Sequence, residues 1–134
     1  MKIVLDTNVF ISGIFFSGPP FEILKAWKNT QFQIILTREI IEEYQRVAES
    51  LAEKFPSIDI LPIIELLSIH GTVINADDFS ISISADPDDD KFIECAIASK
   101  TKIIVSGDKH LLDISGYQGV IVLKPREFLD TYLK

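Results

Sequence analysis

Short apolar runs along the chain alternate with longer segments in which apolar residues recur every three or four positions. Runs with the length and composition of buried parallel strands lie at residues 2–5, 32–36, 102–106 and 120–123, with a shorter candidate at 72–75. Helical spacing predicts helices at residues 21–27, 38–54, 61–69, 91–100 and 125–132. Strands that alternate with helices predict an α/β sandwich around a mainly parallel sheet.

Turn and cap residues mark the ends of these elements. Thr37 is a candidate N-cap for the helix at 38–54, because its hydroxyl can accept a hydrogen bond from a free N–H of the first turn. Pro56 ends that helix, and Gly71 is a candidate C-cap for the helix at 61–69. Residues 76–88 have the composition of an irregular acidic loop.

Length and composition indicate one compact domain over residues 1–134. Hydrophobic residues make up 47% of the chain, yet no run approaches the roughly 18 apolar residues of a membrane-spanning helix. The N-terminus reaches Asp6 too soon for a signal peptide. The lone Cys95 cannot form an internal disulfide and is typical of a reducing compartment. We therefore expect a soluble, cytoplasmic protein with no membrane partner.

The net charge of -7 argues against broad electrostatic binding of nucleic acid, because an acidic surface repels phosphates. Two interpretations accommodate this charge. The protein does not bind nucleic acid, or its acids cluster where divalent cations reverse the local sign. The positions of the acids decide between them.

Two acidic residues directly follow predicted strands. Asp6 comes after the first strand, and Asp108 comes after the strand at 102–106. Sites in parallel α/β folds form beyond the carboxyl ends of the strands, so both acids are site candidates. Either residue alone is equally well explained as the start of a turn or the cap of a helix.

Helix geometry distinguishes the acids of the segment 38–54. With about 100° between successive residues, its apolar side chains share one face, and Glu42 points nearly opposite to that face. Glu43 lies at the edge of the face, where a side chain can reach a cleft beside the core. A solvated position also accounts for Glu43, but the geometry makes it a better candidate than Glu42 or Glu39.

Four acids fall close together at Asp86, Asp88, Asp89 and Asp90. Asp89 heads the stripe of inward-facing residues in the helix that follows, while Asp88 and Asp90 are each rotated off that stripe by about 100°. A helix cap needs one acid, and neighbouring carboxylates repel one another unless cations neutralise them. This favours a metal site over a solvated acidic loop.

The chemistry of these candidates favours a hard cation. His70 and His110 are interpreted as incidental, and oxygen-only ligation favours Mg²⁺ or Mn²⁺ over Zn²⁺. One or two such ions can activate a water and stabilise the transition state of phosphodiester cleavage. Asn8 and Ser106 are candidates to hold an aspartate or a bound water in place.

Four segments in the expected order resemble the motifs of the PIN domain family, named after the PilT N-terminus. Residues 3–9 resemble its opening, in which a strand ends in an aspartate followed by Thr or Ser and often Asn. Residues 42–47 are similar to its second acidic segment, and residues 86–96 and 104–112 to its third and fourth. The resemblance extends from residue 2 to about residue 125.

This resemblance implies a three-layer α/β/α sandwich with a mainly parallel central sheet, and an Mg²⁺- or Mn²⁺-dependent endoribonuclease that cleaves single-stranded RNA. The implied catalytic and metal-binding residues are Asp6, Glu43, Asp89 and Asp108, with Ser106 in the usual Ser or Thr position. Asp90 is an extra acid and stays an alternative to Asp89.

The resemblance also concerns partners. The Asp-Pro-Asp-Asp signature is similar to that of VapC-like toxins of type II toxin–antitoxin pairs, which implies a homodimer and a cognate antitoxin protein. Phe15 and Phe16 are exposed apolar candidates for a dimer contact, and Asp113 is a doubtful fifth ligand. Cations that could contact RNA, although solvation explains each, are Lys25, Lys28, Arg38, Arg46 and Lys109.

Two other functions are considered. A phosphoryl-transfer domain of the receiver or phosphatase type requires acids that the sequence does not place, since Thr7 and Asn8 follow Asp6. A non-catalytic module with the same fold could bind RNA or protein, but all four acids of the motif are present. Metal-dependent cleavage distinguishes an enzyme from such a module.

Overall fold

A central sheet of five parallel strands organises the protein, of which a computed structural model describes residues 1–79, 84 and 86–133. The strands are β1 (Lys2–Leu5), β2 (Gln33–Leu36), β3 (Thr72–Val73), β4 (Ile103–Val105) and β5 (Ile121–Leu123). Their order is β3-β2-β1-β4-β5, so the N-terminal strand lies at the centre. The predicted mainly parallel sheet is confirmed, and every described pairing is parallel.

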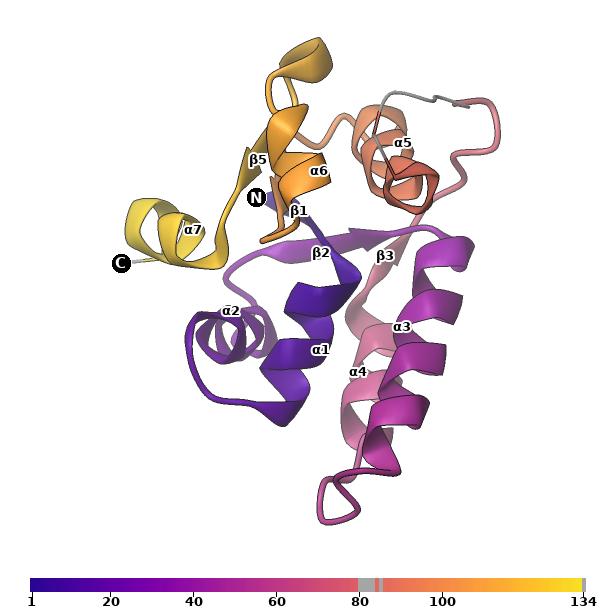
Figure 1. Ribbon diagram of the computed structural model, residues 1–134, viewed down its shortest axis with the longest axis vertical. Helices are drawn as coiled ribbons and strands as arrows, with labels where there is room; N and C mark the ends of the chain where they lie inside the picture. Colours follow the sequence, from indigo (N-terminus) through magenta and orange to yellow (C-terminus); the bar gives the residue numbers. More distant parts are fainter. Residues whose placement is uncertain (80–83, 85, 134) are drawn as a thin grey trace.

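Helices cover both faces of this sheet. They are α1 (Thr7–Phe15), α2 (Pro19–Lys28), α3 (Arg38–Ala52), α4 (Leu61–His70), α5 (Asp90–Ala98), α6 (Lys109–Asp113) and α7 (Pro125–Tyr132), with 3-10 helices η1 (Pro87–Asp89) and η2 (Tyr117–Gly119). In Figure 1, α1 to α4 lie on one side of the sheet, and α5 and α6 lie on the other. Right-handed crossovers impose this division, because the chain reverses direction across the sheet after β3. The predicted three-layer sandwich is confirmed.

The predicted caps are also confirmed. The Thr37 hydroxyl accepts a hydrogen bond from the Ile40 N–H at 3.2 Å, which satisfies a free donor at the start of α3. At the end of α4, the Gly71 N–H donates to the Leu67 carbonyl at 2.8 Å. The last predicted helix has the bounds of α7, and the other predicted helices agree within a few residues.

The sequence pattern did not predict α1, because this helix is buried on several sides and has no polar face to create a period. Gly13 lets α1 approach α2 closely. A Cβ atom at that position would lie 2.7 Å from the Leu24 side chain and 2.7 Å from the Pro20 carbonyl. The five-residue α6 was also missed, since it is shorter than two helical turns.

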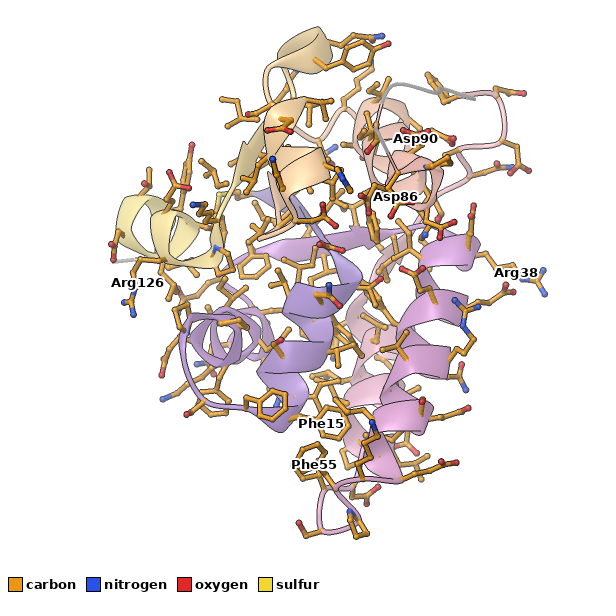
Figure 2. All side chains as sticks on the ribbon, in the orientation of Figure 1. Phe15, Arg38, Phe55, Asp86, Asp90 and Arg126 are labelled. Atoms are coloured by element: carbon orange, nitrogen blue, oxygen red, sulfur yellow. The ribbon has the colours of Figure 1, made fainter. Side chains whose placement is uncertain are left out.

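Two expectations need correction. Of the segment predicted as an irregular loop, residues 80–83 and 85 lie outside the described residues, but its end enters η1, which the Asp86 carboxylate caps by accepting from the Asp88 N–H at 3.1 Å. Phe15 is 7% exposed and packs against Phe55, with ring centroids 5.8 Å apart, so it is a core residue and not an exposed one (Figure 2). Phe16 is 49% exposed, as predicted.

Within the described ranges, no helix combines the length and the apolar character needed to span a bilayer.

Candidate metal centre

The pairing of β1 with β4 brings Asp6 and Asp108 to the same edge of the sheet. The Asp6 N–H donates to the Val105 carbonyl at 3.0 Å, which continues the strand pairing by one residue. The fully buried Ser106 then joins the two acids. Its hydroxyl donates to Asp6 Oδ2 at 2.6 Å and accepts from the Asp108 N–H at 2.9 Å. Ser106 therefore fixes the segments of Asp6 and Asp108 relative to each other. The sequence analysis named it as a candidate to hold an aspartate in place.

The Asp6 carboxyl is almost completely buried. Burial raises its pKa, and the negative charge of Asp108 raises the pKa further. Hydrogen bonds from Ser106 and from the backbone N–H groups of Asn8 and Thr7 lower the pKa. Asn8 thus acts on Asp6 through its backbone, and the predicted contribution of its exposed side chain stays a prediction.

Asp108 caps α6 and so fixes the position of His110. The Asp108 Oδ1 atom accepts a hydrogen bond from the His110 N–H at 2.7 Å. The ring turns back toward the acids, with Nδ1 3.6 Å from Asp108 Oδ1 and 4.0 Å from Asp89 Oδ2. The interpretation of His110 as incidental does not account for this position. Its spacing, two residues after an acid that begins a helix, was the available signal.

Asp89 lies at the head of α5 and is 7% exposed, as expected for the first residue of a buried stripe. Its Oδ2 atom is buried and accepts no hydrogen bond from any residue that the structure describes. Burial, together with the charges of Asp108, Asp6 and Asp86, raises the pKa of this carboxyl to about 6, although His110 acts in the opposite direction. Asp89 therefore shares one site with Asp6 and Asp108.

Asp90 has a different environment. It is also buried, but its Oδ1 atom accepts a hydrogen bond from the Ser84 N–H at 2.9 Å. This bond ties the preceding segment to the start of α5, close to Asp86 (Figure 2). The geometry thus gives Asp90 a structural contact and leaves Asp89 with the unpartnered oxygen.

Glu43 and Glu42 have the exposures that helix geometry predicts. The Glu42 side chain is 65% exposed and pairs with Arg38 at 3.2 Å, whereas the Glu43 side chain is 18% exposed. Glu43 Oε2 accepts a hydrogen bond from the Thr7 hydroxyl, and Oε1 lies 2.9 Å from Lys91 Nζ. Glu43 therefore reaches the start of α1 and the start of α5. Its metal-binding role stays a prediction.

Lys91 is a buried cation beside the acids that the sequence analysis did not single out. Its ammonium group donates to the Asp88 carbonyl, pairs with Glu43 and lies 5.2 Å from the centroid of the Phe92 ring. A lysine directly after a run of aspartates was the only signal in the sequence. Its partner comes from α3, which local spacing cannot reveal.

Tyr44, the residue after Glu43, attaches α3 to the centre of the sheet. This side chain is fully buried, stacks on Phe10 with centroids 4.3 Å apart, and donates a hydrogen bond to the Leu5 carbonyl at the end of β1. Burial raises the pKa of the Tyr44 hydroxyl well above 10, so it stays a hydrogen-bond donor. Tyr44 thereby fixes α3 against the strand that carries Asp6.

A cleft of about 650 Å³ adjoins this region through Lys91. It is lined by Thr37, Arg38, Glu39, Val73, Ile74, Asn75, Ala76, Asp77, Lys91 and Glu94. Asp6, Asp89 and Asp108 do not line it, so the cleft lies beside the acids and does not contain them. Its lining combines cations, acids, an amide and apolar side chains.

The remaining candidates lie on α2, α3 and α6. Asp113 is an exposed residue at the end of α6, and Lys25 and Lys28 lie on α2. Arg46 lies 3.9 Å from Glu43, and Lys109 is an exposed residue at the start of α6.

Comparisons with known proteins agree with this arrangement. A family model described as "PIN domain" matches residues 2–110, a range that includes Asp6, Glu43, Asp89 and Asp108. The uncharacterized protein MJ1680 of Methanocaldococcus jannaschii is 28% identical over 146 aligned positions, which cover 100% of this chain and 93% of that protein.

Proposed function

The chain belongs to the PIN domain family, a nuclease-type fold, and from this premise we propose that it is a metal-dependent endoribonuclease that cleaves single-stranded RNA. One observation carries the proposal. Three acids from separate segments lie close together, since the charge of Asp108 raises the pKa of Asp6 and the charges of Asp108 and Asp6 raise the pKa of Asp89, and the buried Oδ2 atom of Asp89 has no hydrogen-bond donor among the described residues.

The residues present fit a divalent cation. A buried carboxylate oxygen without a partner is costly, and three neighbouring carboxylates repel one another. A divalent cation removes both penalties, and the carboxylate oxygens are the ligands that Mg²⁺ and Mn²⁺ prefer. We assign Asp6, Asp89 and Asp108 as its ligands and prefer Asp89 to Asp90, whose carboxylate is occupied by Ser84.

The chain's own residues position the reacting groups. Ser106 orients the Asp6 carboxylate, and the first turn of α6 holds Asp108. Thr7 and Lys91 hold Glu43, which we assign as the fourth acid at the margin of the site. A divalent cation bound by these acids would supply positive charge to the phosphodiester and lower the pKa of an attacking water.

The cleft beside Lys91 supports a single-stranded substrate. A strand with unstacked bases can place one base in a recess while its phosphate reaches the acids. Arg38 and Lys91 place positive charge in a lining that also carries the acids Glu39, Asp77 and Glu94. Asn75 supplies an amide that can donate and accept hydrogen bonds. These features allow recognition of a base and a phosphate despite the acidic net charge.

We also propose that the protein acts in the cytoplasm as the toxin of a toxin–antitoxin pair. In this proposal it forms a homodimer and binds a cognate antitoxin protein. The support is the motif resemblance together with the exposed Phe16, which packs edge-on against Phe55 with centroids 5.5 Å apart. Size-exclusion chromatography with light scattering tests the dimer. A monomer at micromolar concentration would contradict this part of the proposal alone.

The nuclease is tested by incubating the protein with a pool of single-stranded RNA in Mn²⁺, Mg²⁺ or EDTA, beside Asp6→Asn. We expect metal-dependent cleavage that the variant lowers by at least about 100-fold, since loss of a ligand exceeds the loss caused by a supporting residue. RNA duplex and DNA of the same sequence are the substrate controls. An unchanged rate in Asp6→Asn, with the fold intact by circular dichroism, would remove Asp6 from the site.

A matched pair of glutamates tests the margin of the site in the same assay. Glu43→Gln should lower cleavage, whereas Glu42→Gln should be nearly silent, because Glu42 is exposed and contacts only Arg38 in the described structure. Equal effects of the two substitutions would contradict the assignment of Glu43.

A further inference from the structure

A second group of ligands lies beside the three acids and includes a nitrogen. One carboxylate oxygen each from Asp86 and Asp89 and a ring nitrogen of His110 all lie within 4.8 Å of one another. Asp86 and Asp89 lie three residues apart, at the cap and at the last residue of η1, and His110 lies in the first turn of α6. Local sequence brings the two acids together, and the fold brings His110 to them.

We propose that Asp86, Asp89 and His110 bind a first-row transition-metal ion at a mixed oxygen and nitrogen site that discriminates against Mg²⁺. An imidazole nitrogen suits transition metals, whereas Mg²⁺ favours oxygen ligands and retains its waters. This site goes beyond the nuclease proposal, which uses carboxylates alone, and it shares only Asp89 with that proposal.

The separation of His110 Nδ1 and Asp89 Oδ2 allows one ion to contact both atoms without a large rearrangement. His110 Nδ1 lies 4.0 Å from Asp89 Oδ2. Two ligand atoms that each lie about 2.1 Å from one ion are separated by roughly 3.0 to 4.2 Å, depending on the angle between them. The observed separation falls within that range.

The unpartnered oxygen of Asp89, which the nuclease proposal also assigns to a cation, is a second observation that points to a ligand. The Asp89 side chain is 10% exposed, and its Oδ2 atom, the one nearest His110, has no hydrogen-bond partner among the described residues. Such an atom loses hydration without replacement, a cost that a bound cation removes.

His110 is the residue through which an ion can enter. Its side chain is 46% exposed, while its Nδ1 atom faces both Asp89 and Asp108. The neutral imidazole can present a lone pair at Nδ1 and keep its Nε2 proton. Access and a ligand atom are thus combined in one residue.

The test measures metal binding without RNA, by calorimetric titration of the full chain with Co²⁺ and separately with Mg²⁺. The wild type should bind Co²⁺ more tightly than Mg²⁺. His110→Ala should lower the Co²⁺ affinity by at least about tenfold and change the Mg²⁺ affinity by less than about twofold. His70→Ala, a substitution of an exposed histidine on α4, is the matched control and should change neither. Equal Co²⁺ affinity in His110→Ala and the wild type would overturn the proposal.

A second pair of variants tests the oxygen ligands. Asp86→Asn should weaken Co²⁺ binding, whereas Asp88→Asn, which changes an exposed neighbour, should not. Equal losses in both variants would mean that the acidic segment acts only through its net charge, and would also overturn the proposal. Because no RNA is present, a failed nuclease assay leaves this result standing, and the reverse holds as well.

Discussion

The acids at the edge of the sheet and those at the head of α5 are held in different ways. At the sheet edge, the Asp6 carboxylate accepts a hydrogen bond from the Ser106 hydroxyl, and the Asp108 carboxylate accepts one from the His110 N–H, while the Asp108 N–H donates to Ser106. At the head of α5, Asp90 is bonded to Ser84, but the Asp89 Oδ2 atom is buried without a donor in the described structure. The carboxylates of the first region thus have donors from the protein, while the second region keeps a buried carboxylate oxygen for the proposed cation.

The difference follows from the elements that carry the acids. Asp6 and Asp108 each precede a helix in an extended conformation, so free backbone N–H groups of that helix's first turn lie beside their carboxylates. Asp89 instead continues from η1 into α5 in a helical conformation, and its carboxylate accepts no such cap hydrogen bond. Burial without hydrogen bonds thus marks Asp89 as the residue on which a cation site depends.

The largest expected effect comes from replacing the neighbouring acids Asp89 and Asp90 with Asn, one at a time. Asp89→Asn should lower metal-dependent cleavage by at least about 100-fold while leaving the metal-free protein folded, since it removes a buried unpaired charge. Asp90→Asn should cost about 1 kcal/mol of folding free energy, because it weakens the bond to Ser84, and should retain more activity. Cleavage rates and urea unfolding in EDTA measure both, and the opposite ranking would break the comparison.

The second effect concerns the pH dependence of stability without metal. Because the folded pKa of Asp89 is about 6, above its ordinary value of 3.8, the folded state retains this proton over a range in which the unfolded state has lost it. The stabilisation is therefore full below pH 3.8 and is lost as the pH rises through about 6. From pH 4 to pH 6, the wild type should lose on the order of 2 kcal/mol relative to Asp89→Asn. Parallel stability curves in EDTA would contradict the assigned burial of this charge.

The smallest effect tests the completed edge of the sheet. Ser106→Ala removes the donor to Asp6 and the acceptor of the Asp108 N–H, so cleavage should fall by about tenfold as the two acids lose their shared orientation. Ser106→Thr keeps the hydroxyl and should recover part of the rate. A loss in Ser106→Ala as large as that of Asp89→Asn would show that the edge is no more complete than the head of α5.

Much of the site could be predicted because its signals are local. A strand pattern that ends in an acid places Asp6 and Asp108 at one edge of a parallel sheet, and about 100° per residue separates Glu43 from Glu42. The same spacing does not separate Asp89 from Asp90 by burial, since both side chains are buried. Each inference needs only the period of one element and the direction of its buried face.

The other residues of the site could not be predicted in this way. Lys91 pairs with Glu43 of another helix. His110 turns toward Asp89, from which β4 separates it in the sequence. Helix α1 was missed because a helix buried on several sides has no polar period. These features depend on contacts between distant segments.

The sequence by itself determined the order of the strands and of the longer amphipathic helices, together with the acids at their ends, since hydrophobic periods and strand ends are properties of neighbouring residues. Only the tertiary structure decided which carboxylates receive donors and which do not. The hydrogen bonds of Asp6 and the unpartnered oxygen of Asp89 depend on what the fold brings to each carboxylate from elsewhere in the chain. Packing therefore decides which carboxylate keeps an unpartnered oxygen, although the acids themselves are visible in the sequence.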